Sequence, residues 1–189
     1  MGKYEFTDEI KVVNGIALHR IKAITDFWNV KAGELGGFIE KRANLSDEGN
    51  AWVCDNAEVS GDAEVYGDAR VCDNARVCDN ARVCDNAWVY GNARVCGDAR
   101  VCDNAWVSDN AEVSDNADYI CIKSLGSEYR NTTFFNNKKG GVSVCCGCFH
   151  GTLDEFAAKV KETHADNVYA KEYLAAVEVV KIHFGIKED

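Results

Sequence analysis

Small apolar and polar side chains alternate with a period of six residues through the middle of the chain. From Ala51 to Asp118 the unit reads Ala-x-Val-x-(Asp/Gly)-(Asn/Asp), and no valine of the series from Val53 to Val113 is missing. An alanine and a valine two positions apart point to the same side of an extended strand. An amphipathic helix needs a period near 3.6 and a coiled coil one near 3.5, so the pattern excludes both.

The polar pairs between these short strands predict turns. They read Asp-Asn, Gly-Asp or Gly-Asn, and these residue types tolerate the positive φ angles of tight corners. Strand and corner therefore alternate every six residues, which is the signature of a solenoid. The two ends of a solenoid are open sheet edges, so the flanking segments are expected to cap them.

The repeat resembles the hexapeptide motif of left-handed parallel β-helix proteins, in which an aliphatic residue is followed four positions later by a small one, as Val71 is by Ala75. That resemblance implies triangular coils of three hexads, with residues 18 apart stacked in columns. The residues before the valines then form three columns: Trp52, Arg70, Trp88 and Trp106; Glu58, Arg76, Arg94 and Glu112; and Glu64, Arg82, Arg100 and Asp118. Because like residues share a face in these columns, we predict a mainly β fold with a left-handed parallel β-helix of nearly four coils, roughly 18 Å long.

Three parts follow from this organisation. Residues 1–50 are predicted to be the N-terminal cap, with a hairpin turning at Asn14-Gly15 and an irregular first coil. Residues 51–118 form the β-helix. Residues 119–189 form a small α+β domain, with strands near 119–122, 132–135 and 142–146 and two helices, the first begun by a capping box of Thr152 and Glu155.

The amino-acid composition argues against two classes of binding partner, nucleic acids and membranes. The 189 residues carry a formal net charge of −10, which argues against general nucleic-acid binding because such proteins need a basic face. No signal peptide and no long apolar run is visible, so we expect a cytoplasmic protein without membrane contact. In that reducing compartment the ten cysteines are expected to be thiols.

The column Trp52, Arg70, Trp88 and Trp106 is the most distinctive predicted surface. Exposed tryptophans on one face favour packing against another subunit or domain. Two alternatives stay open: a ladder that only stabilises the sheet, or a groove in which a nucleobase stacks.

The paired arginines allow two interpretations. Arg76 with Arg94, and Arg82 with Arg100, are each one coil apart, so an anion could bridge them. Alternatively the acids in the same columns offset them in an ordinary surface ladder, which contributes little in water.

The cysteines raise two further questions. Cys54 and Cys72, Cys78 and Cys96, and Cys84 and Cys102 stack in pairs, and we expect reduced thiols there rather than disulfides. Near the C-terminus, Cys145, Cys148 and His150 have zinc-ligand types, with Cys121 as a fourth candidate. The alternative is that these are small buried side chains of a strand.

Enzymatic function has little support in the sequence. The hexapeptide-repeat resemblance implies acyltransferases that use a histidine base between subunits, yet none of His19, His150, His164 and His183 lies in the regular coils. No active site is therefore carried over, and no cofactor is predicted. Some similar repeat proteins are described as transferases on their fold alone.

The tail adds a second resemblance. Cys-Gly-Cys-Phe-His-Gly-Thr-Leu-Asp-Glu-Phe, at residues 146–156, resembles the tails of uncharacterised proteins of bacteria and their phages. The sequence thus predicts a non-catalytic homo-oligomer, a trimer or dimer, that binds or scaffolds and in a phage setting is directed at a host protein in the host cytoplasm. The alternative is a protein that sequesters a small nucleotide or another anion at a subunit groove, and an acyltransferase-like enzyme is the second alternative.

Overall fold

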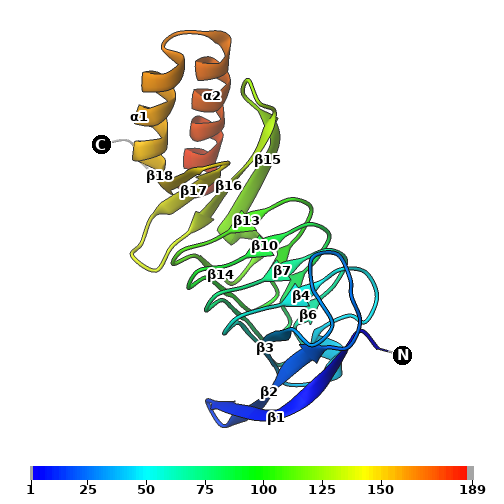
Figure 1. Cartoon of the computed structure of the whole chain (residues 1–189). Coiled ribbons are helices and arrows are strands. Elements are labelled where there is room, and N and C mark those ends of the chain that lie inside the picture. The colour runs from blue at the N-terminus through cyan, green and yellow to red at the C-terminus, as the bar shows by residue number, and fades with distance from the viewer. Residues whose placement is uncertain (1, 187–189) are drawn as a thin grey trace.

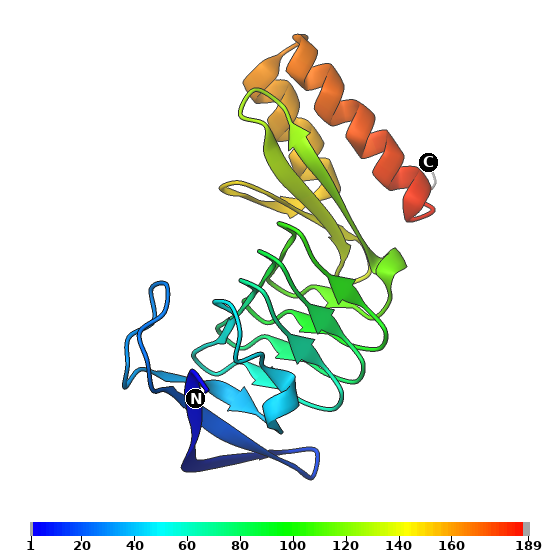
Figure 2. The ribbon, with the colours of Figure 1, turned by 90° about the vertical axis from the view of Figure 1, so that its right-hand side faces the viewer.

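The computed structural model describes residues 2–186 and shows an elongated molecule with a solenoid between two end structures (Figures 1 and 2). At one end, β1 (Tyr4–Val13) and β2 (Ile16–Ala23) form the predicted hairpin. Its turn residues Asn14 and Gly15 have φ angles of 51° and 83°. Two successive positive φ angles define a type I′ turn, whose twist matches that of the strands.

The hexads fold into short strands of two residues each. They stack in register on strands 18 residues away, so that Val53 pairs with Val71 and Val77 with Val95. The predicted parallel β-solenoid with 18 residues per coil is therefore confirmed. The strands are β4 (Trp52–Val53), β5 (Glu58–Val59), β6 (Glu64–Val65), β7 (Arg70–Val71), β8 (Arg76–Val77), β9 (Arg82–Val83), β10 (Trp88–Val89), β11 (Arg94–Val95), β12 (Arg100–Val101), β13 (Trp106–Val107) and β14 (Glu112–Val113).

Three parallel sheets make the walls of this prism. They run in the orders β4-β7-β10-β13, β5-β8-β11-β14 and β6-β9-β12. From Ala51 to Val113 the alanines and valines of the hexads point inward and are almost fully buried, because each strand presents one face to the interior. At the corners the aspartates of the Asp-Asn pairs up to Asp109 take positive φ angles, for example 61° at Asp79 and 58° at Asp85.

The N-terminal cap continues one wall of the solenoid. Strand β3 (Leu35–Ile39) pairs antiparallel with β2 and parallel with β5. A 3-10 turn, η1 (Arg42–Asn44), follows. The buried Asn44 side chain donates to the carbonyls of Gly61 (3.0 Å) and Ala63 (2.8 Å), which would otherwise be unpaired at the open edge.

The C-terminal part is an antiparallel sheet covered by two helices. After η2 (Asn116–Asp118) come β15 (Tyr119–Leu125), β16 (Arg130–Asn136), β17 (Val142–Cys146), β18 (Phe149–Thr152), α1 (Leu153–His164) and α2 (Val168–His183). The predicted capping box of Thr152 and Glu155 is present. The sequence pattern predicted only three strands, because β18 is short and contains Gly151.

The two faces of this sheet have different partners. Phe134 packs with the helices, in a core that includes Phe156 and Tyr173. Its neighbour Phe135 and Cys145 belong instead to the core of the solenoid. The sheet therefore closes the open end of the prism, as a capping segment must. Neither helix of the described residues is long and apolar enough to cross a membrane.

Candidate functional site

The tryptophan column is half covered by the N-terminal part. Trp52 is fully buried and Arg70 is only 4% exposed, so these two residues do not belong to a free surface as the sequence pattern suggested. The loop between β2 and β3 lies over them, with Phe27 edge-on to Trp52 at 5.4 Å between ring centroids. This loop has no hexad pattern, so periodicity gave no sign of where it packs.

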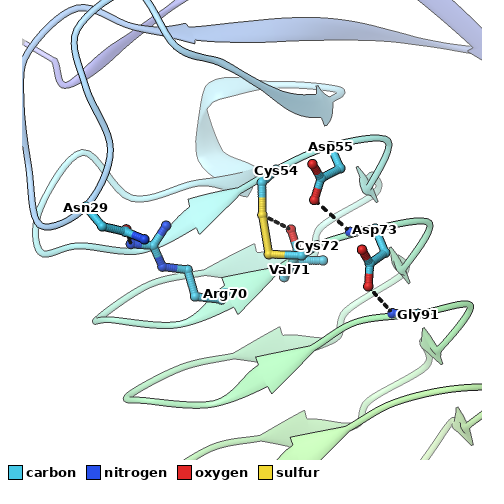
Figure 3. Close-up of a disulfide and its surroundings, with 8 residues drawn as sticks. All are labelled: Asn29, Cys54, Asp55, Arg70, Val71, Cys72, Asp73 and Gly91. Carbon is cyan, nitrogen blue, oxygen red and sulfur yellow. Dashed lines mark hydrogen bonds between the residues drawn. A yellow bond between two sulfur atoms is a disulfide. The ribbon is translucent and has the colours of Figure 1, made fainter.

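Arg70 is held from two sides by this loop. Its Nη2 donates to Asn29 Oδ1 (2.8 Å), as Figure 3 shows, and its guanidinium lies 4.0 Å from the centre of the Trp28 ring. Burial lowers the pKa of Arg70 to about 10, which leaves it charged at neutral pH. Arg70 therefore packs on an indole from outside its own column, and this residue, Trp28, was not among the predicted site residues.

The other half of the column remains accessible. Trp88 and Trp106 are 36% and 37% exposed, and their rings stack 5.7 Å apart at 24°. Trp28 adds a further indole that is 60% exposed. We call Trp28, Trp88 and Trp106 the aromatic stripe.

A cleft opens where the stripe meets the C-terminal sheet. This junction cleft has a volume of about 430 Å³ and is lined by Asn104, Trp106, Tyr129, Arg130, Asn131, Cys145 and Gly147. The backbone N–H of Trp106 donates to Thr133 Oγ1 (3.1 Å), which fixes β13 against β16. Arg130 forms no ion pair with any residue in the range 2–186. Within the part of the chain that the structure describes, no acidic side chain lines the cleft.

His150 lies beside the junction cleft and contacts the solenoid. Its Nδ1 is 3.4 Å from Ser108 Oγ and 3.8 Å from an Asp109 carboxylate oxygen, and its Nε2 is 3.5 Å from Tyr90 Oη. No histidine belongs to the regular coils of residues 51–118. Because β18 packs against the solenoid, His150 nevertheless contacts two successive coils, at Tyr90 and Ser108. Local sequence patterns do not predict this packing.

The predicted zinc ligands do not gather. Cys145 and His150 are cross-strand partners, with Cys145 Sγ 4.0 Å from His150 Nε2. Cys148 is exposed in the turn between β17 and β18, and it forms no metal-sized cluster with the other two among the described residues. Cys145 is buried, and desolvation raises the pKa of its thiol to about 12. The alternative of a buried strand cysteine therefore describes Cys145.

The arginine columns are partnered by acids or lie beside thiols. Arg76 pairs with Glu58 (3.1 Å) and Arg82 with Glu64 (3.6 Å). The pKa of Arg94 is raised by Cys96 and Cys78, and that of Arg100 by Cys84. The ion pairs of Arg76 and Arg82 fit the surface-ladder interpretation for those two residues. Both columns lie on sheets other than that of the aromatic stripe.

One cysteine pair differs from the expectation of reduced thiols. Cys54 and Cys72 form a disulfide across one coil, with their Cα atoms 4.7 Å apart (Figure 3). The in-register stacking of coils brings equivalent side chains together, and this separation is within the range that disulfides require. The other two repeat pairs are free thiols.

Comparison with known proteins gives a family match within the repeats. The model of the YdcK beta solenoid repeat matches residues 75–91, 81–97, 87–103 and 93–109, in steps of one hexad. The chain is a β-solenoid repeat protein. It is 35% identical over 63 residues to the "Uncharacterized acetyltransferase YdcK" of Escherichia coli (strain K12), a match that covers 29% of this chain and 19% of that relative. The chain thus spans about a fifth of the relative's length.

Proposed function

We propose that this is a non-catalytic binding protein whose junction cleft holds a small anion bearing a flat ring, of the mononucleotide class. The observation that carries the proposal is that an exposed indole, Trp106, and an arginine without an ion pair among residues 2–186, Arg130, both line one cleft. The site lies within one chain, which differs from the subunit groove expected from the sequence.

The lining residues suit such a ligand. A base stacked on an aromatic side chain gains roughly 1–3 kcal/mol, and Trp106 and Tyr129 both offer ring faces, Tyr129 being 73% exposed. A guanidinium matches a phosphate with two parallel hydrogen bonds. Asn104 and Asn131 supply donors and acceptors for the edge of a base. The volume of about 430 Å³ lies in the usual range for small-molecule sites.

Local charge supports an anion here despite the acidity of the protein. The whole chain carries −10, yet the described residues that line the junction cleft include one cation and no carboxylate. Electrostatic attraction at short range depends on the nearest charges, because distant surface charges are screened by salt.

The test measures binding of mononucleotides by calorimetry and by quenching of tryptophan fluorescence. We expect binding of a nucleoside monophosphate, weaker binding of the nucleoside, and a roughly tenfold loss for Arg130→Gln, since a hydrogen bond to a charged group contributes about 1.5–3 kcal/mol. Arg82→Gln is the matched control, because Arg82 is exposed on another face. Equal binding by both variants, or no binding by the native chain, would overturn the proposal.

Acetyl transfer is the second candidate. It is favoured by the name of the E. coli relative, an acetyltransferase, and by the contact of His150 with Asp109, since a carboxylate can orient a histidine base. Coenzyme A binding, with acetyl transfer lost in His150→Gln, would support it. Failure to bind coenzyme A would remove this candidate.

A further inference from the structure

Three groups of identical composition lie at corners of the solenoid. Each contains a cysteine, the aspartate that follows it, and the cysteine one coil further on: Cys54, Asp55 and Cys72; Cys78, Asp79 and Cys96; Cys84, Asp85 and Cys102. In each group the sulfur and carboxylate atoms lie within 4.8 Å of one another. The first group is closed by the disulfide, and the other two hold free thiols.

We propose that the groups Cys78-Asp79-Cys96 and Cys84-Asp85-Cys102 are binding sites for a thiophilic divalent cation such as Zn²⁺ or Cd²⁺. Two thiolates and one carboxylate are ligand types that zinc accepts. With Zn–S near 2.3 Å and Zn–O near 2.0–2.2 Å, a tetrahedral ion keeps its ligands roughly 3.3–3.8 Å apart. The sulfur and carboxylate atoms, now within 4.8 Å of one another, need to move only slightly closer to reach these separations. The fourth position of the tetrahedron is left for water.

The backbone fixes the carboxylates before any ion binds. Asp79 Oδ2 accepts from the N–H of Gly97 (3.1 Å) and faces the Cys78 thiol at 3.5 Å. In the same way, Asp85 Oδ2 accepts from the N–H of Asp103 (3.2 Å) and faces the Cys84 thiol at 3.5 Å. Each aspartate thus has one oxygen anchored to the next coil, which orients the carboxylate beside its cysteine pair.

Binding of the cation to each group displaces the protons of its two thiols. Two S–H bonds break, two metal–sulfur bonds form, and two protons leave for solvent. Two thiolates, one carboxylate and a divalent cation sum to −1, and an arginine lies beside each group, Arg94 and Arg100 respectively. Burial raises the pKa of Cys78 to about 11, so this thiol keeps its proton at neutral pH until an ion displaces it.

Entry to the sites is open on the outside of the prism. Cys78 and Cys102 are half-buried, and Asp79 and Asp85 are exposed. Cys84 and Cys96 are buried. Each pair therefore combines one buried cysteine with one half-buried cysteine.

The test is a titration of the purified full chain with Cd²⁺ alone, followed through the sulfur-to-cadmium charge-transfer band and by calorimetry in two buffers. We expect two ions per chain while the Cys54–Cys72 disulfide is intact and three after its reduction, with about two protons released per ion. Asp79→Asn together with Asp85→Asn should weaken binding by at least about 10–100-fold, the loss seen when a group that only supports a metal ligand is removed, because here the carboxylate itself is a ligand.

Serine is the replacement of choice for the cysteines. Ser60, Ser108 and Ser114 already occupy the same position of other hexads, so Cys→Ser variants preserve the repeat. Cys78→Ser with Cys96→Ser should remove one ion, and the further changes Cys84→Ser and Cys102→Ser the second, while Cys148→Ser serves as the control. Absence of the band in the native chain, or an unchanged stoichiometry in the folded fourfold variant, would overturn the proposal.

Discussion

The guanidinium of Arg70, in the second coil, lies 4.0 Å from the centre of the Trp28 ring in the N-terminal loop. Together with the bond to Asn29, this contact ties the loop to one wall of the solenoid. Residues 42 positions apart in the chain are thereby joined, and the aromatic stripe is extended beyond the regular coils.

Arg70→Met is expected to loosen this loop. A cation–π contact contributes roughly 0.5–2 kcal/mol and a charged hydrogen bond about 1.5–3, while the charge no longer has to be buried, so we expect a net loss of about 1–3 kcal/mol. Urea unfolding measures this loss, with Arg82→Met as the exposed control. Equal unfolding midpoints for the two variants would contradict it.

Homo-oligomerisation stays a prediction from the tryptophan column, and Trp88 is the residue that tests it. If a second copy packs on the aromatic stripe, Trp88→Ser should lower the oligomeric state, because buried aromatic residues dominate such interfaces. Native mass spectrometry gives the subunit number directly. A monomer for both the native chain and the variant would show that no copy packs there.

Cys145 and Cys148 are expected to differ sharply in reactivity. The thiolate is the reactive form, and the pKa of Cys145 is raised by burial from 9.0 to about 12, which alone slows alkylation by about three orders of magnitude. Cys148 is exposed in its turn. Peptide mapping after timed iodoacetamide treatment of the folded protein should find Cys148 labelled first. Early labelling of Cys145 would mean that the C-terminal sheet leaves the solenoid end easily.

Lys3 should make stability depend on pH above neutrality. Its side chain is buried beneath the loop, donates to the Gly49 carbonyl (3.2 Å), and has its pKa lowered by burial from 10.5 to about 8. Between about 8 and 10.4 the unfolded chain retains a proton that the folded chain has lost, so this contribution to the free energy of unfolding rises with pH.

The comparison with Lys3→Met isolates this contribution. The difference in unfolding free energy, native minus variant, should increase as the pH is raised from about 8 towards 10. Other groups that titrate in this range are common to both proteins and cancel. A constant difference would show that Lys3 is charged in both states.

The sequence predicts the solenoid well because each hexad carries its own strand and corner signals. Val53, Val71 and Val89 stack as the 18-residue period requires. The hairpin turn at Asn14-Gly15 and the capping box at Thr152 are equally local. In these places, the residues that determine the structure are neighbours in the chain.

The candidate site is different because it arises from docking between distant segments. Trp106 and Arg130 meet in one cleft only after the C-terminal sheet closes the prism. The burial of Trp52 depends on a loop without periodicity. Sequence patterns report which side of a strand a residue occupies, but they do not report which segment later covers that side.

The 18-residue coil also sets rules for changing the length of this protein. Removing one hexad, such as residues 87–92, would turn everything downstream by a third of a revolution and move the junction cleft to a different face from Trp28. Removing a full coil would shorten the prism by about 4.8 Å and leave both ends facing as before. Insertions and deletions that preserve the relative orientation of the two end structures are therefore confined to multiples of eighteen residues.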